Sequence, residues 1–103
     1  MQIEVIKELC KQSKMKWSAH GLERMQERDI SREDIKKCIA NGEIIESYPN
    51  DYPHPSCLVF GYTVNNKVIH VVVGCDSEYI YIVTAYFPNT VKFENDLRTR
   101  KGC

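Results

Sequence analysis

The sequence lacks long apolar runs, close cysteine pairs and glycine-rich phosphate loops. No apolar run approaches the roughly 20 residues that a membrane-spanning helix needs. The N-terminal stretch MQIEVIKELC carries acidic residues among its apolar ones, so we do not expect a signal peptide. Neither a GxGxxG nor a Walker motif occurs, which argues against a nucleotide-binding loop. We therefore expect a soluble cytoplasmic protein without a membrane segment.

The five cysteines are scattered along the chain and form no CxxC pair. Zinc sites usually draw on such close pairs, so we expect neither a metal site nor another cofactor. Without a secretory signal, free thiols in a reducing compartment are the simplest interpretation. Cys38 and Cys57 lie in apolar patterns, which predicts that both side chains are buried.

Charge is balanced in total but unevenly distributed. The chain has 14 lysines and arginines and 14 acidic residues, which argues against a strongly basic nucleic-acid binder. Basic residues nevertheless outnumber acidic ones in residues 11–37 and 92–101, whereas acidic residues dominate residues 43–81. Two basic regions around an acidic middle could form one positive face of the folded domain.

The first half of the 103-residue chain is predicted to be helical. Apolar residues recur at helical spacing in residues 2–14. Ser18 is a suitable N-cap for a second helix over residues 19–28, and Ser31, which precedes two acidic residues of the next turn, caps a third helix. Gly42 predicts a left-handed end of that third helix.

The second half has the composition and turn signals of β-strands. Residues 44–48 predict one strand, and two longer strands flank the asparagine pair at 65–66, which suits a tight hairpin. Residues 79–87 predict a last strand, and a polar tail with at most one helical turn follows Pro88. We therefore expect a single α+β domain over residues 1–103, with helices on one face of an antiparallel sheet of about four strands.

The stretch SAHGLERMQERDIS places His20, Arg24 and Arg28 four residues apart, on one side of the second helix. A solvated helix face is the simpler interpretation, because charged side chains usually lie at the surface. However, Glu23 and Glu27 lie on the flank of this stripe, so its cations are predicted to lack i, i+4 partners. Two uncompensated guanidinium groups suit a phosphate, and a neutral imidazole near the helix start suits a general base.

Two further candidates lie on predicted strands. In the last strand, alternation places Thr84 and Tyr86 on one face together with the isoleucines. The Tyr86 hydroxyl could bind a phosphate there, or its ring could stack on a base, although ordinary strand composition explains both residues equally well. His70 lies in the apolar stretch VIHVVV, where a buried core residue is the commoner outcome. We count Thr84 and His70 as candidate RNA-binding residues.

Several motifs taken together resemble a known bacterial family. An H-x3-R-M-x2-R helix start, an I-S-x-x-D-I helix, a G-E-I-I-E-x-Y strand and a final T-A-Y-x-P occur in this order. Over about residues 16–100 the chain resembles the family catalogued as domain of unknown function 4258. This family is similar to the RelE-like toxins of the barnase, EndoU, colicin and RelE fold group. Phe93 stands where relatives often carry tryptophan.

The resemblance implies a metal-independent ribonuclease fold, with N-terminal helices packed on a curved antiparallel sheet. RNA would be the substrate, and a small antitoxin, in some relatives with a zinc finger, would be the protein partner. The family motifs correspond here to His20, Arg24, Arg28, Thr84 and Tyr86.

Cleavage of RNA without a metal requires that the 2′-OH lose a proton, attack the adjacent phosphorus and displace the 5′ oxygen, while cations stabilise the added charge. We expect His20 to act as the base or the acid, with Arg24 and Arg28 stabilising the phosphorane. Tyr86 would donate a hydrogen bond or the second proton, and Thr84 would orient a phosphate or Tyr86. The alternative is a non-catalytic module that binds RNA or an acidic antitoxin segment through the same cations.

Overall fold

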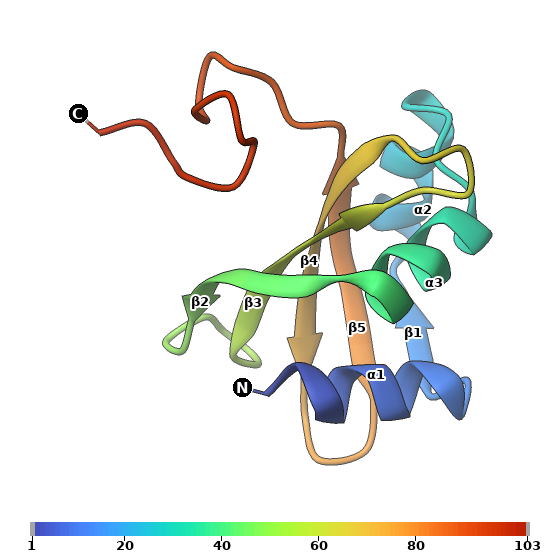
Figure 1. Ribbon diagram of the computed structural model, residues 1–103. Coiled ribbons are helices and arrows are strands. Elements are labelled where there is room, and N and C mark those ends of the chain that lie inside the picture. The colour runs from blue at the N-terminus through green and yellow to red at the C-terminus, as the bar shows by residue number, and fades with distance from the viewer. Residues whose placement is uncertain (1, 103) are drawn as a thin grey trace.

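The computed structural model describes residues 2–102 of the chain. Within them, three helices and five strands form an α+β domain (Figure 1). The helices are α1 (Ile3–Lys11), α2 (Ala19–Glu27) and α3 (Arg32–Asn41). The strands are β1 (Met15–Trp17), β2 (Glu43–Tyr48), β3 (Ser56–Tyr62), β4 (Val68–Cys75) and β5 (Ile80–Tyr86). The predicted α+β class is confirmed.

Both predicted helix caps are present. The Ser18 hydroxyl accepts a hydrogen bond from the Gly21 amide over 2.8 Å, and α2 begins at the following residue. Ser31 and Asp34 form a complete capping box at the start of α3. These side chains satisfy amide groups that have no partner inside the helix, which is why both helices begin where the sequence predicts.

The predicted left-handed end of α3 is wrong. Gly42 has φ −93° and ψ 175°, which is extended backbone that any residue adopts. Glycine is required here for space, because a Cβ atom on Gly42 would lie 2.4 Å from the carbonyl oxygen of Cys38 and 2.8 Å from that of Phe60. The close approach of α3 to β3 therefore selects the glycine.

The strands form one mixed sheet in the order β1-β5-β4-β3-β2. Strands β2 to β5 pair antiparallel, as predicted, whereas β1 pairs parallel with β5 and aligns Met15 with Ile80. The expected number of about four strands is therefore too low by one. Three residues are too few for alternation to show in the sequence, and the pairing of β1 depends on a strand near the other end of the chain.

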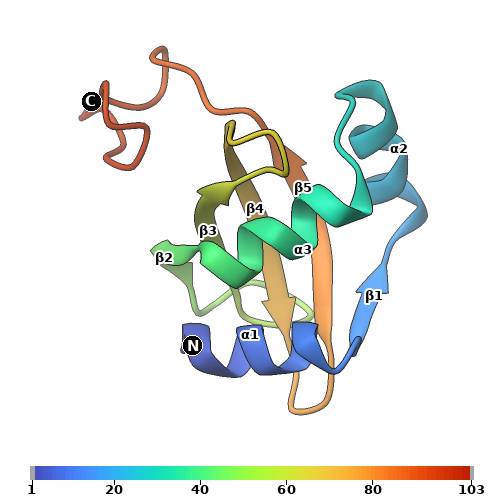
Figure 2. The same ribbon diagram turned by 45° about the vertical axis from the view of Figure 1, so that its right-hand side comes forward.

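The helices cover one face of the sheet, with α1 and α3 lying across it (Figure 2). Fully buried side chains from both layers form the core, among them Ile6, Ile35, Ile39, Val59, Val71, Val73 and Ile80. Cys38 and Cys57 belong to this core and are 0% exposed, which confirms their predicted burial. Burial raises the pKa of Cys38 to about 12 and that of Cys57 to about 11, so both thiols stay protonated at neutral pH.

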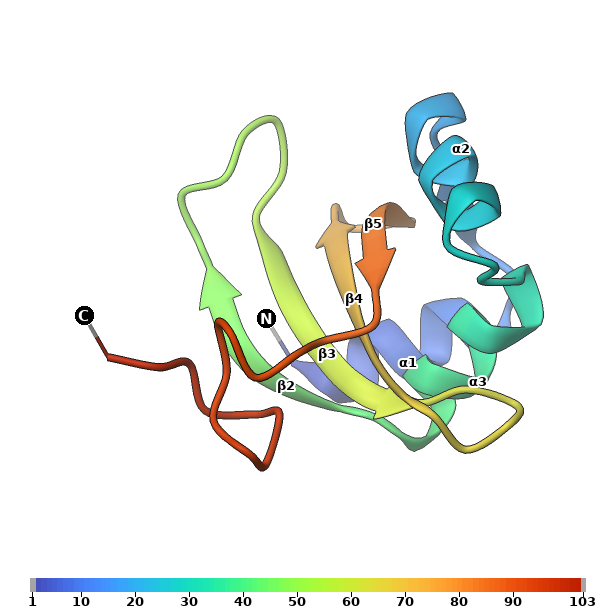
Figure 3. The ribbon, with the colours of Figure 1, turned by 90° about the horizontal axis from the view of Figure 1, so that it is seen from above.

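The opposite face of the sheet is partly covered by residues 88–102, here called the C-terminal segment. After β5 this segment turns back and crosses over β3 toward β2 (Figure 3). Phe93 anchors it, because its side chain is 2% exposed and its ring meets the His70 ring edge-on at a centroid distance of 4.6 Å. The backbone of Phe93 also forms an isolated β-bridge with Arg100, which folds the segment onto itself.

No described helix is long and apolar enough to cross a membrane. Cys10, Cys38, Cys57 and Cys75 carry free thiols, and Cys103 lies outside the described residues.

Candidate anion-binding cavity

A β-bulge in β5 determines which way Thr84 and Tyr86 point. The pairing with β4 skips Val83, between Ile82 and Thr84. As a result Ile82 and Ala85 both face the helices, whereas Thr84 and Tyr86 face the side of the C-terminal segment. The predicted alternation, which grouped Thr84 and Tyr86 with the isoleucines of the strand, is wrong here because one extra residue moves the rest of the strand to the other face.

Tyr86 lines a cavity of about 540 Å³ that lies between the end of α2, the end of β5 and the C-terminal segment. Its lining residues are Arg28, Tyr86, Phe87, Pro88, Asn89, Lys92, Phe93 and Arg100. Three of these side chains are cations, and none of the described lining residues carries a side-chain carboxylate. A concave site with three cations and a phenol is complementary to a phosphate group.

Arg28 reaches the cavity from the C-terminal end of α2. Its Nη1 atom donates to the carbonyl oxygen of Ala85 over 2.8 Å and to the hydroxyl of Thr84 over 3.3 Å. These bonds use one terminal nitrogen, so Nη2 and Nε can still donate to an anion. The fold thus brings three of the predicted site residues, Arg28, Thr84 and Tyr86, into one place.

His20 and Arg24 lie on the same helix but do not line the cavity. His20 is exposed and precedes Arg28 by two helical turns, which corresponds to about 12 Å along the helix axis. Arg24 forms an ion pair with Glu27, with 2.9 Å between Nη1 and Oε2. The prediction that the guanidinium groups of the stripe are uncompensated is therefore wrong for Arg24, because Glu27 reaches it at the i, i+3 spacing and not at the i, i+4 spacing on which the prediction rests.

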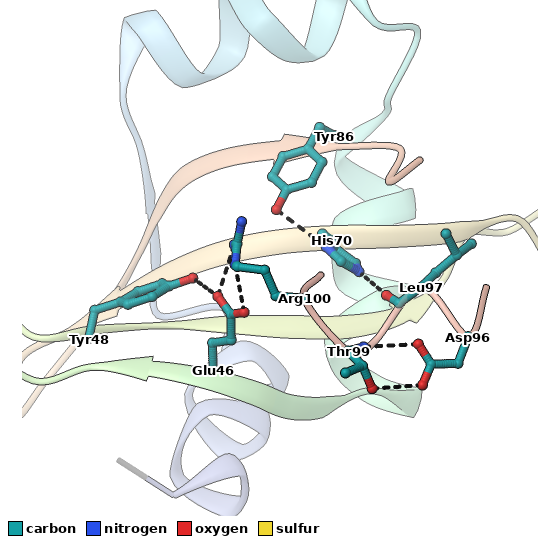
Figure 4. Close-up of polar contacts among 8 residues, drawn as sticks. All are labelled: Glu46, Tyr48, His70, Tyr86, Asp96, Leu97, Thr99 and Arg100. Carbon is teal, nitrogen blue, oxygen red and sulfur yellow. Dashed lines mark hydrogen bonds and ion pairs between the residues drawn. The ribbon is translucent and has the colours of Figure 1, made fainter. Parts of the chain in front are cut away.

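His70 is fully buried beneath the C-terminal segment. Its Nε2 atom lies 2.7 Å from the carbonyl oxygen of Leu97, and its Nδ1 atom lies 3.3 Å from the hydroxyl oxygen of Tyr86 (Figure 4). Burial lowers the pKa of His70, although the Leu97 carbonyl and Glu46 act in the opposite direction. The ring therefore contacts Tyr86 and the segment and is closed to solvent.

Arg100 connects the C-terminal segment to β2. Its Nε and Nη2 atoms donate to the two carboxylate oxygens of Glu46 over 2.9 and 3.0 Å (Figure 4). These hydrogen bonds lower the pKa of Glu46, so the carboxylate is a weak base. Tyr48 also donates to Glu46, and burial together with that carboxylate raises the pKa of Tyr48 to about 12. Arg100 lines the cavity while it holds this pair.

Lys92 and Arg100 are cavity residues that sequence reasoning did not identify. The excess of basic residues in 92–101 is the signal that could have pointed to them. Nothing in the local pattern, however, relates these residues to β5. They reach the cavity because Phe93 is buried against His70 and draws the segment back over the sheet.

The fold and the cavity together define an α+β domain with a cationic site suited to an anion. Within residues 2–102, no cluster of three or more His, Cys, Asp or Glu side chains is arranged to hold a metal ion. The chain matches the family model described as Domain of unknown function (DUF4258) over residues 17–87, which is more than half of its length. It therefore belongs to this family, as its motifs predict. The matched region includes α2 and β5 and stops before the C-terminal segment. No curated protein and no solved structure matches the chain.

Proposed function

We propose that this chain is a metal-independent ribonuclease toxin of a bacterial toxin–antitoxin pair, with a RelE-like fold, that cleaves RNA by attack of the 2′-OH on the adjacent phosphate. The observation that carries the proposal is the convergence of Arg28, Lys92, Arg100 and Tyr86 around one cavity. A phosphodiester placed there would meet three cations and a phenol. Cations aimed at the phosphorane oxygens supply the electrostatic stabilisation that such a reaction needs.

Some of the lining residues would bind the charged phosphate, and another would contact the neighbouring nucleobase. Arg28 reaches the cavity from the end of α2 and Lys92 from the C-terminal segment, and both would bind the non-bridging oxygens of the phosphate. Phe87 lines the same cavity with 37% of its surface exposed, so a base next to that phosphate could stack on its ring. His20 continues the basic stripe along α2, where it would contact a neighbouring phosphate of the strand, whereas Arg24 is paired with Glu27.

The test is cleavage of a single-stranded RNA oligonucleotide by the purified protein in a buffer that contains EDTA. We expect products that end in a 2′,3′-cyclic phosphate and no cleavage of DNA of the same sequence, which lacks the attacking 2′-OH. Arg28→Ala should lower kcat about a hundredfold, because it removes a donor to the developing charge. Arg24→Ala is the matched control on the same helix face. The enzyme proposal fails if the wild-type protein cuts no RNA and its expression slows neither translation nor growth.

A second function is favoured by one observation. The described lining of the cavity contains neither a carboxylate nor an imidazole that could act directly as a base. A non-catalytic module would use the same cations to bind RNA, or to bind an acidic segment of an antitoxin, with or without a zinc finger. In that case Arg28→Ala weakens binding while no cleavage is present to be lost. A small reading frame next to the gene, whose product forms a complex with this chain and suppresses its toxicity, would favour the toxin function.

A further inference from the structure

None of the described side chains that line the cavity is a carboxylate or an imidazole, but His70 lies directly behind Tyr86. Three parts of the chain meet at this imidazole ring (Figure 4). β4 carries His70, β5 supplies the hydroxyl of Tyr86, and the C-terminal segment supplies the carbonyl of Leu97 and the ring of Phe93. The His70 side chain is 0% exposed, and the ring of Phe60 in β3 also packs against it, at a centroid distance of 6.0 Å.

The carbonyl of Leu97 determines which nitrogen of His70 carries the hydrogen. A carbonyl oxygen only accepts, so the 2.7 Å contact requires a hydrogen on Nε2. In a neutral ring Nδ1 is then an acceptor. The hydroxyl of Tyr86 has one hydrogen, and the contact to Nδ1 at 3.3 Å directs it toward His70. The oxygen of Tyr86 is therefore left to accept a proton from a group inside the cavity.

We propose that His70 is a positioning residue of this site, which accepts the Tyr86 proton at Nδ1 so that the Tyr86 oxygen acts as the base toward the attacking 2′-OH. The catalytic part of this inference rests on the ribonuclease function proposed above. It reverses the role expected for Tyr86 from the sequence, where the phenol donates a hydrogen bond or the second proton. It also gives the cavity a proton acceptor, although its described lining contains neither a carboxylate nor an imidazole.

The proton transfers balance within one catalytic cycle. As the 2′-OH attacks, its proton passes to the Tyr86 oxygen, and the Tyr86 proton passes to Nδ1 of His70. The O2′–P bond forms and the P–O5′ bond breaks. The proton held on His70 then returns through Tyr86 to O5′. The products are a 2′,3′-cyclic phosphate and a 5′-hydroxyl, and both side chains regain their starting states.

Charged groups from two elements set how readily His70 takes up that proton. Glu46 of β2 favours the protonated ring, whereas Arg100 of the C-terminal segment opposes it. The neighbouring Tyr48 is neutral, and Arg98 stacks over Phe60 of β3 at 4.1 Å from the ring centroid. A phosphate bound in the cavity adds negative charge beside Arg100. The bound substrate itself therefore favours the transient imidazolium.

Nitrogen NMR of His70 tests the geometry without any RNA. We expect a neutral ring at pH 7 with its hydrogen on Nε2. Tyr86→Phe should shift the Nδ1 resonance and leave the Nε2 resonance in place. A hydrogen on Nδ1, or an Nδ1 resonance that does not respond to Tyr86→Phe, would overturn the inference even if the protein cleaves RNA. Conversely, a wild-type protein that cuts no RNA and slows neither translation nor growth refutes the proposed function, while the NMR result still shows whether Tyr86 donates its hydrogen bond to Nδ1 of His70.

Two substitutions of His70 test its contact to Leu97 and its contact to Tyr86 separately. His70→Gln places an amide near the position of Nε2 and can still donate to Leu97, but it cannot accept a proton from Tyr86. His70→Asn places an amide near the position of Nδ1 and loses the contact to Leu97. Trypsin reports on the docking of the C-terminal segment, because Lys92, Arg98 and Arg100 are cleavage sites within it.

We expect His70→Gln to resist trypsin as well as the wild type does. Its kcat should nevertheless fall about a hundredfold, and it should lose the decline in rate at acidic pH that protonation of His70 causes in the wild type. His70→Asn should be cut by trypsin about tenfold faster, because the buried hydrogen bond to Leu97 is lost. A His70→Gln protein with a docked segment and an unchanged kcat and pH profile would overturn the inference.

Discussion

The Nη1 atom of Arg28 lies 2.8 Å from the carbonyl oxygen of Ala85, so the end of α2 is attached to the end of β5. This bond holds the guanidinium against the cavity that Tyr86 also lines. Arg24, one turn earlier, pairs with Glu27 instead. Of the three side chains in the basic stripe, Arg28 is the one that lines the cavity, and this difference can be measured.

Arg28→Ala should weaken the binding of RNA about tenfold, because it removes a charged donor from the cavity. Arg24→Ala should weaken binding less than about threefold, since Arg24 is already paired with Glu27. Fluorescence anisotropy of a labelled single-stranded RNA at one fixed salt concentration measures both. Equal losses for the two variants would show that the whole stripe, and not the cavity, binds the anion.

Lys92→Gln tests whether the C-terminal segment contributes to the same site. Lys92 lines the cavity, whereas Lys101 of the same segment does not. Removal of one phosphate contact should reduce the salt dependence of binding, with the slope of log K against log salt falling by about 0.7 for a single strand. Lys101→Gln should leave that slope unchanged. If both variants behave alike, the segment attracts RNA only through its overall charge.

Glu46→Gln should make the stability of the domain less dependent on pH. Arg100 lowers the pKa of Glu46 in the folded protein below the unfolded value of about 4.3. The pair therefore stabilises the fold above that unfolded value, and the contribution is lost as the pH falls through the folded pKa. Since the Arg100 side chain is 47% exposed, the effect on the free energy of unfolding should stay below about 1 kcal/mol.

Urea unfolding of the wild type and Glu46→Gln at pH 7 and pH 3 measures this contribution. The wild type should lose more stability between the two pH values than the variant does. Glu94→Gln is the control, because Glu94 is exposed. An equal loss in the wild type and in Glu46→Gln would mean that the Arg100 pair does not form in solution.

Gly61→Ala should destabilise the fold by about 1–3 kcal/mol, the usual cost of overpacking a core. A Cβ atom on Gly61 would lie 2.5 Å from the carbonyl oxygen of Cys38 and 2.7 Å from its Sγ atom, where α3 packs on β3. Gly74→Ala is the matched control on β4, since its nearest neighbour would be 3.7 Å away. Urea unfolding compares the two. A Gly61→Ala protein as stable as Gly74→Ala would mean that α3 does not approach β3 so closely.

Much of the local structure could be predicted from short stretches of sequence. Ser18 and Ser31 each satisfy amides within their own helix, so their effect is visible in four consecutive residues. The asparagine pair at 65–66 lies between β3 and β4, as predicted, and Asn66 has φ 61°. The basic stripe of α2 follows from helical periodicity alone. These features depend on neighbours in the chain, which a sequence displays directly.

The site could not be predicted in the same way. The bulge at Val83 depends on how β5 pairs with β4, and it turns Tyr86 away from the helices and toward His70. Arg28 lines the cavity because it donates a hydrogen bond to Ala85 of β5, which lies 57 residues further along the chain. Arg24 pairs with Glu27 of its own helix instead. Both the bulge and the position of Arg28 depend on how one element pairs with another, for which the periodicity of a single segment gives no signal.

By itself, the sequence determined the α+β class, the helix caps and a supply of cations on α2, because hydrogen bonding and periodicity within a few residues are sufficient for these. Which cations line the same cavity was decided by the tertiary structure alone. Burial of Phe93 against His70 brings Lys92 and Arg100 back across the sheet to Arg28 and Tyr86. The segment folds back because burial of the Phe93 ring removes apolar surface from water. The ring can be buried in this way only once the sheet that carries His70 has formed.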